Sequence, residues 1–198
     1  MIRESVIVSG VGGQGIQVAS TLLCAAATAR GWSACHYVIL GSQIRGGLCE
    51  CYSTISDSPV TSPPLFSACT GAIVMHPQSL PRGLEGRVLP GGLYLVNITL
   101  VNSTLVPDGQ AQRDDYKVLQ IPATSIAREL GNVLAASMVA IGAYAAATEL
   151  LEPEELARRL NEVLPPYRSA LIELNRKAIA AGAAFVGTTT PGAAQPRA

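Results

Sequence analysis

The sequence contains few charged residues and no excess of either sign. Charged residues make up 14% of the 198 positions, and 14 basic side chains balance 14 acidic ones. No basic stripe or arginine-rich run occurs, so nucleic acid is not an expected partner. Apolar residues reach 48%, which is more than a freely soluble monomer usually accommodates without exposing apolar surface. A large permanent protein interface explains this balance; a compact, alanine-rich domain with a modest surface is the alternative.

Long hydrophobic runs are also missing. The longest apolar-leaning stretch, residues 132–147, is rich in alanine with polar interruptions and is too short to span a bilayer. At the start of the chain, no charged segment precedes an apolar one, as it would in a secretory signal. We therefore expect a cytoplasmic protein that neither crosses a membrane nor has a membrane partner.

Metal-binding side chains are scarce and poorly spaced. The sequence has two histidines, His36 and His76, and no Cys-x-x-Cys pair. A structural zinc or iron–sulfur site needs four ligands at a workable spacing, and an odd number of cysteines argues against a disulfide framework. We predict no metal site and assign the cysteines to core packing. The five cysteines are Cys24, Cys35, Cys49, Cys51 and Cys69.

The pattern of apolar residues predicts strands that alternate with helices. A β-branched run at residues 5–9 is followed by a glycine-rich turn and a helical pattern that ends near Gly31. The sequence from residue 124 onward is helical in pattern, and Leu156, Leu160 and Leu164 give residues 154–164 one apolar face. Further strands are predicted at residues 34–40, 48–56, 72–75, 93–97 and 117–121.

This order of elements predicts an α/β fold. We expect a three-layer Rossmann-like domain with a largely parallel sheet and a helical C-terminal part. No interior linker or repeat interrupts the chain, so residues 1–186 are predicted to form a single domain. Residues 187–198 are small and polar and include proline, and we expect them to form a mobile tail.

The glycine-rich turn indicates a phosphate site. Gly10, Gly12 and Gly15 fit the pattern G-x-G-x-x-G between a strand and a helix. In that pattern the glycines permit a tight turn, close approach of a pyrophosphate and close packing of the helix, whose N-terminus offers free N–H groups. A turn that serves only strand–helix packing is the alternative.

A nicotinamide dinucleotide fits this turn poorly. Such a site needs an acidic residue at the end of the second strand to bind the ribose hydroxyls, yet no Asp or Glu occurs between Ser5 and Cys49. An NADP site would need a basic residue instead, and Arg45 lies a few residues into the next loop, followed by Gly46 and Gly47. The pattern alone leaves the identity of the phosphate open.

Two glycine motifs in order carry a family resemblance. Gly10–Ile16, followed by a helix rich in small residues and then by Gly41–Gly47, resembles the γ subunit of pyruvate and related 2-oxoacid:ferredoxin oxidoreductases. The similarity continues through Ser56–Val60 with Ser62-Pro63 and covers about residues 4–185. The substrate stays open among pyruvate, 2-oxoglutarate, branched-chain, indolepyruvate and arylglyoxylate.

The resemblance implies a subunit of an enzyme that oxidatively decarboxylates a 2-oxoacid to its acyl-CoA. In such enzymes the chemistry takes place on thiamine diphosphate with Mg²⁺, and electrons leave through iron–sulfur clusters towards ferredoxin or another acceptor. This sequence has neither a thiamine-binding motif nor a run of cluster cysteines, so we expect those cofactors on partner subunits. The isolated chain is then expected to be inactive and to have no catalytic residue of its own. A stand-alone Rossmann-type nucleotide-binding or redox-sensing protein is the alternative.

For this chain we predict a contribution to coenzyme A binding and to assembly of the complex. The carboxyl ends of the strands should bring the glycine turn, the second glycine loop and His76-Pro77 to one edge of the sheet. Backbone N–H groups and the Arg45 guanidinium would bind phosphate, although Arg45 could instead pair with a carboxylate of the thiamine-binding subunit. The predicted binding residues are Gly12, Gly13, Gln14, Gly15, Arg45, Gly46 and Gly47.

Overall fold

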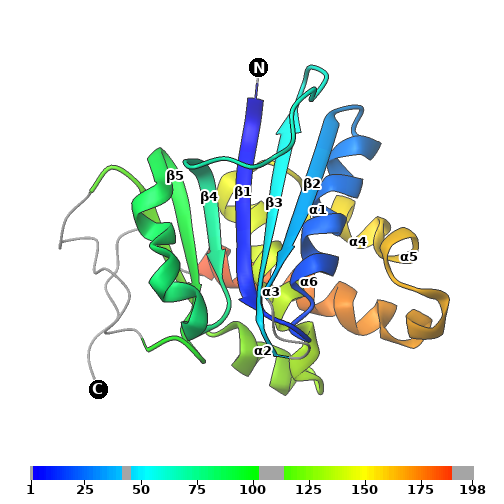
Figure 1. Ribbon diagram of the computed structural model, residues 1–198. Coiled ribbons are helices and arrows are strands. Elements are labelled where there is room, and N and C mark those ends of the chain that lie inside the picture. The colour runs from blue at the N-terminus through cyan, green and yellow to red at the C-terminus, as the bar shows by residue number, and fades with distance from the viewer. Residues whose placement is uncertain (1, 42–45, 103–113, 189–198) are drawn as a thin grey trace.

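The fold is built on one six-stranded sheet, seen in Figure 1. The computed structural model describes residues 2–41, 46–102 and 114–188. In the sheet the strands lie in the order β2-β3-β1-β4-β5-β6. The strands are β1 (Ile2–Val11), β2 (Ser33–Leu40), β3 (Leu48–Ser56), β4 (Cys69–Val74), β5 (Val88–Asn97) and β6 (Lys117–Ile121).

The direction of the strands confirms the predicted α/β class. Strands β1, β4, β5 and β6 pair in parallel, whereas β3 lies between β1 and β2 and is antiparallel to both. The sheet is therefore mixed, with β3 alone running against the other five. Because β3 separates β2 from β1, the first β–α–β unit does not place its two strands side by side, as a dinucleotide-binding unit would.

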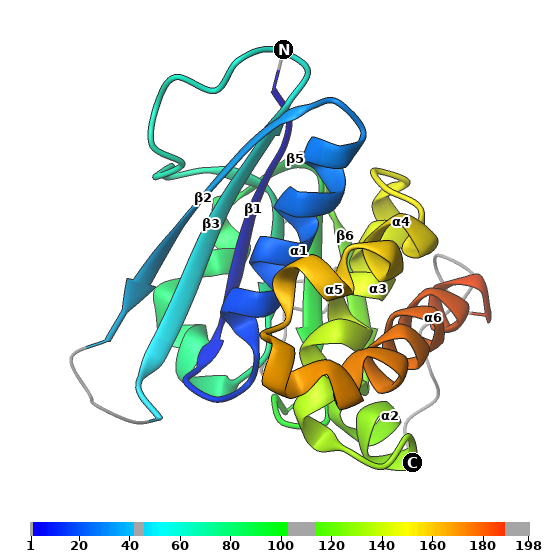
Figure 2. The same cartoon turned by 90° about the vertical axis from the view of Figure 1, so that its right-hand side faces the viewer.

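Helices cover the two faces of the sheet unequally, as Figure 2 shows. The α-helices pack on one face, and two 3₁₀ helices, η1 (Pro77–Arg82) and η2 (Leu84–Arg87), lie on the other. The α-helices are α1 (Ile16–Ala29), α2 (Ala123–Glu129), α3 (Ala136–Thr148), α4 (Pro153–Arg158), α5 (Leu160–Val163) and α6 (Ile172–Thr188). In the part of the chain that the structure describes, no helix is long and apolar enough to cross a membrane.

The larger core lies between the sheet and the α-helices. Val6, Ile7 and Val8 of β1 are at most 1% exposed, because a central strand is buried from both faces. Cys24, Cys49, Cys51 and Cys69 are buried, which confirms their predicted packing role, and Cys35 is partly buried. Burial raises the pKa of the Cys24 and Cys69 thiols to about 11, so both stay protonated at neutral pH.

One predicted helix in the C-terminal half is divided in two. We expected one helix over residues 154–164, but α4 ends at Arg158 and α5 begins at Leu160. The Arg159 N–H between them bonds to the Leu156 carbonyl oxygen at 3.0 Å, three residues back, so the chain forms a 3₁₀-type turn at this point. Leu156, Leu160 and Leu164 are nevertheless buried as predicted.

The last helix extends slightly beyond its predicted end. Helix α6 includes Gly187 and Thr188, which we assigned to the tail. Residues 189–198 lie outside the described residues, so the domain boundary stays a prediction.

Candidate functional site

The glycine-rich turn joins the end of β1 to the start of α1. Gly13 (φ 97°) and Gly15 (φ 75°) adopt left-handed backbone conformations, which glycine reaches without steric cost. Gly15 is the N-cap of α1, no side chain caps the helix, and its first turn has no acidic residue. Among the described residues, the positive end of the helix dipole thus has no side-chain partner, an arrangement that favours an anion.

Gln14 holds the turn together from inside. Its Oε1 accepts a hydrogen bond from the Val11 N–H at 3.0 Å, and its Nε2 lies 3.5 Å from the Met75 carbonyl oxygen after β4. A side chain at Gly10 would collide with this amide, because a Cβ there would lie 2.6 Å from Oε1. We predicted Gln14 as a ligand-binding residue; in the structure its amide is engaged within the turn.

The second glycine loop lies beside the turn. The Gly12 N–H donates to the Gly47 carbonyl oxygen at 2.9 Å, and a Cβ on Gly12 would lie 3.6 Å from the Gly46 nitrogen. Together with the Gln14–Met75 contact, next to His76, this confirms that the three segments meet at one edge of the sheet. The Gly12 N–H therefore already has a hydrogen-bond acceptor within the protein and is not available to a ligand. Arg45, the predicted cation, lies outside the described residues.

The tip of the turn faces open space. Gly12 and Gly13 are exposed, and a Cβ on Gly13 or Gly46 would meet no atom of the described residues within 4 Å. On the inner side, a Cβ on Gly15 would lie 2.7 Å from the Ser137 Oγ of α3. The turn therefore presents its backbone outward while its last glycine packs closely against α3.

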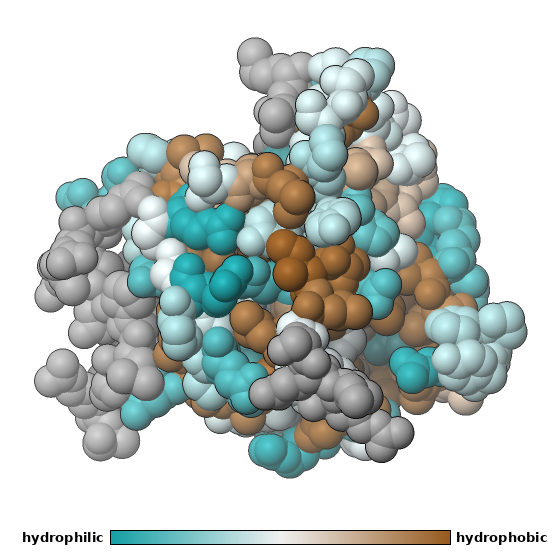
Figure 3. Space-filling view, viewed as in Figure 1, coloured by the Kyte–Doolittle hydropathy of each residue, from teal (hydrophilic) through white to brown (hydrophobic). Residues whose placement is uncertain are grey.

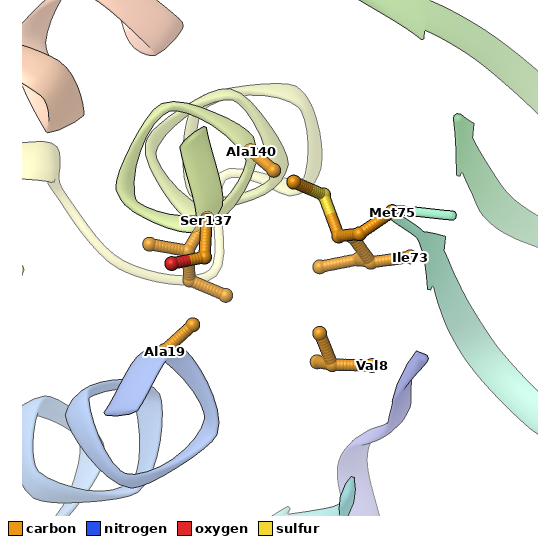
Figure 4. Close-up of a pocket in the computed structure, with 7 residues that line it drawn as sticks. Val8, Ala19, Ile73, Met75, Ser137 and Ala140 are labelled. Carbon is orange, nitrogen blue, oxygen red and sulfur yellow. The ribbon is translucent and has the colours of Figure 1, made fainter. Parts of the chain in front are cut away.

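The small void under the turn is not a ligand pocket. Figure 4 shows that it lies between α1, α3 and the sheet, with mainly apolar side chains around it. It has no room for a water molecule. The Ser137 Oγ is buried here and has no hydrogen-bond partner among the described residues. The residues that line the void are Val8, Ala19, Ile73, Met75, Ser137, Ala140 and Ile141.

A buried carboxylate lies on the other face of the same edge. Glu50 of β3 is 1% exposed and pairs with Ser9 of β1 in the sheet. Arg82 binds its two oxygens in a bidentate pair, with Nε–Oε1 at 3.0 Å and Nη2–Oε2 at 3.1 Å, and Tyr52 Oη donates to Oε2 at 3.2 Å. This hydrogen-bonded carboxylate raises the pKa of Arg82.

Sequence reasoning missed this ion pair. The one available signal was an isolated acidic residue, Glu50, inside an otherwise uncharged strand pattern. Because a buried carboxylate needs a partner, a single Glu in such a strand predicts a nearby cation. The spacing of the residues along the sequence did not indicate that this cation is Arg82.

Neither a metal site nor a dinucleotide site is assembled in the described residues. There, no three His, Cys, Asp or Glu side chains are placed to hold a metal ion. Strand β2 ends at Leu40 without an acidic residue, and Glu50, the first acidic residue after the turn, is occupied by Arg82. The edge thus offers backbone donors and open space but no ribose-binding carboxylate.

Comparisons with known proteins agree on one family. The family model described as pyruvate ferredoxin/flavodoxin oxidoreductase matches residues 5–185. The 2-oxoglutarate synthase subunit KorC of Methanocaldococcus jannaschii is 28% identical over 166 residues, which are 83% of this chain and 85% of that protein.

Two solved structures share the fold. The γ subunit of a keto/oxoacid ferredoxin oxidoreductase from Geobacter sulfurreducens superposes with a TM-score of 0.76 at 25% identity, covering 94% of this chain and all of that one. A 2-oxoglutarate:ferredoxin oxidoreductase from Magnetococcus marinus, solved with 2-oxoglutarate, coenzyme A and succinyl-CoA bound, gives a TM-score of 0.77 at 18% identity. The match covers 95% of this chain and 32% of that chain.

Proposed function

Because the chain belongs to the pyruvate ferredoxin/flavodoxin oxidoreductase family, we propose that this γ-type subunit helps to bind coenzyme A in a 2-oxoacid oxidoreductase complex. The complex would oxidatively decarboxylate a 2-oxoacid and transfer the acyl group to coenzyme A. The chain itself would supply binding surface and no reacting group.

The observation that carries the proposal is the open glycine edge. The uncapped N-terminus of α1 and the exposed tip at Gly13 lie beside Gly46 and Gly47. Coenzyme A carries a pyrophosphate and a 3′-phosphate, and these groups bind well to backbone N–H donors at a helix N-terminus. Arg45, next to Gly46 in sequence, would add a bidentate cation.

Thiamine diphosphate, Mg²⁺ and the iron–sulfur clusters are assigned to partner subunits. The described cysteines are buried in the core or partly buried in β2, and none of them belongs to a cluster of potential metal ligands. These residues do not fit an iron–sulfur centre. The final electron acceptor, ferredoxin or another, would accordingly be selected by those partner chains.

The role of Arg45 is tested in the co-expressed complex. A phosphate role for Arg45 predicts that Arg45→Ala leaves assembly intact and raises the KM for coenzyme A. The loss of one charged hydrogen bond, about 1.5–3 kcal/mol, corresponds to roughly 10- to 150-fold. Loss of the complex, with unchanged coenzyme A kinetics in the surviving fraction, would make Arg45 an interface residue instead.

A matched pair at Gly13 tests the glycine edge independently of Arg45. Gly13→Glu and Gly13→Gln impose the same backbone strain at φ 97°, and both side chains have open space around them. They differ in one carboxylate, which would repel a bound phosphate. We expect Glu to raise the KM for coenzyme A several-fold more than Gln, with the KM for the 2-oxoacid equal in both. Equal KM values for coenzyme A in the two variants would place its phosphates elsewhere.

A further inference from the structure

Strand β2 is an edge strand without the features that usually protect such strands. It lies at the end of the sheet order and has no Asp, Glu, Lys, Arg or Pro over Ser33–Leu40. Natural proteins blunt exposed edges with charges, prolines or bulges, because unpaired backbone N–H and C=O groups attract other strands. An eight-residue edge strand without charges, prolines or bulges is therefore expected to be covered by a partner.

The face beside this edge also exposes apolar side chains. Tyr37 and Ile39 lie opposite Tyr52 and Glu50 in the sheet register, so they point to the face that carries η1 and η2. They are 49% and 37% exposed. In Figure 1 the 3₁₀ helices lie over β4 and β5 and not over β2, whereas the β3 side chains on this face, Glu50 and Tyr52 among them, are buried. Figure 3, which has the same view, shows apolar surface near the middle of the molecule and hydrophilic side chains beside it.

Two arginines cover Glu50 and Tyr52, the β3 residues that pair with Ile39 and Tyr37. Arg82 holds Glu50 and keeps 46% of its side chain exposed. The Arg87 guanidinium lies over the Tyr52 ring, 5.6 Å from its centroid, and donates to the Tyr52 Oη at 3.3 Å. Glu50, Arg82 and Arg87 form a network of one carboxylate and two guanidinium groups, which together carry one net positive charge.

We infer that the exposed β2 face (Tyr37 and Ile39, with Arg82 and Arg87 over the neighbouring strand β3), together with the β2 edge, is the surface that docks on a partner subunit of the oxidoreductase complex. The partner would present an apolar patch bordered by acidic side chains. Tyrosine and arginine are enriched at protein interfaces, and complementary charge selects the correct partner. A second copy of this chain fits less well, because it would bring a second positive network to the first.

The test rests on the proposed function, because it needs the partner subunits. Affinity-tagged chain is co-expressed with the thiamine-binding and iron–sulfur subunits, and the co-purified subunits are quantified. We expect Tyr37→Glu to reduce co-purification by about tenfold or more, since it buries a charge and repels an acidic partner. Tyr37→Lys should reduce it less, and Tyr37→Phe should leave it unchanged.

Tyr167 provides the matched control. It is 80% exposed on η5 (Pro166–Leu171), in the helical layer away from this face, so Tyr167→Glu should assemble like the wild type. Thermal unfolding midpoints of the purified variants check that each chain folds.

The outcomes distinguish an error in the proposed function from an error in the docking surface. If the wild-type chain fails to retain the partner subunits, the proposed function itself is wrong. If the wild type assembles and Tyr37→Glu assembles equally well, the docking surface is wrong while the proposed function stands. The docking surface is also wrong if Tyr37→Glu abolishes only self-association of this chain.

Discussion

At Gly15, both the backbone conformation and a neighbouring side chain disfavour a larger residue. At Gly13, the backbone conformation alone does so. Both have positive φ, but only Gly15 faces a side chain, Ser137 Oγ, at 2.7 Å from a Cβ position. We expect Gly13→Ala to cost about 1–2 kcal/mol of unfolding free energy from the left-handed conformation. Gly15→Ala should cost about 1–3 kcal/mol more from overpacking. Urea denaturation of both variants measures the difference, and adding Ser137→Ala to Gly15→Ala should recover part of it. Equal losses in the two single variants would refute the contact.

Glu4 predicts a pH dependence of stability. The residue is 8% exposed, Tyr144 Oη donates to its Oε1 at 2.7 Å, and Thr70 Oγ1 donates to the same oxygen. Burial raises its pKa in the folded state despite these hydrogen bonds. The folded state therefore favours the protonated acid, so this stabilisation is complete below the unfolded pKa and is lost as the pH rises through the folded pKa.

The variant Glu4→Gln isolates this effect. A neutral amide can accept the same two hydrogen bonds and does not ionise. The difference in unfolding free energy between wild type and variant should thus shift in favour of the variant as the pH rises from about 4 to 7, by about 1.4 kcal/mol for each unit of pKa shift. Chemical denaturation at several pH values gives this difference; a difference independent of pH would show that the Glu4 pKa is not raised.

At the scale of elements, helices α3 and α6 cross at two glycines. A methyl group on Gly142 of α3 would overlap the Ile179 carbonyl oxygen, and one on Gly182 of α6 would overlap that of Val139. We expect Gly182→Ala to lower the unfolding free energy by about 1–3 kcal/mol, because the backbones must separate. Gly187→Ala, near the end of α6 with no described atom within 4 Å of its Cβ position, should be neutral or up to about 1 kcal/mol stabilising. Thermal or urea unfolding compares the two, and a tolerated Gly182→Ala would contradict the close crossing.

Local patterns predicted most elements but not their spatial order. The β-branched run of β1, the glycine turn and the helix up to Gly31 follow from residues that are neighbours in sequence. The insertion of β3 between β1 and β2 depends on pairing over many residues, and no local pattern encodes it. The Glu50–Arg82 ion pair likewise joins residues 32 positions apart. At the candidate site, the motifs predicted the convergence of the glycine segments, but only the structure revealed that the Gly12 N–H and the Gln14 amide are already engaged.

For the whole molecule, the low charge and the open β2 edge predict association. Expressed alone, the chain should self-associate or dissolve poorly, since apolar surface that belongs at an interface is then exposed. Co-expression with its partner subunits should give a single homogeneous complex. Sedimentation velocity distinguishes these states, and a well-behaved monomer at high concentration would count against an obligate interface.

The most direct test of the γ-subunit assignment is activity of the reconstituted complex. Partner subunits from the same source are purified with and without this chain, and reduction of a viologen dye is measured with a 2-oxoacid and coenzyme A. We predict that full activity requires this chain and that adding it back restores coenzyme A-dependent turnover. Unchanged activity without the chain, together with an isolated chain that binds NAD as a monomer, would contradict the assignment and favour a stand-alone nucleotide-binding protein.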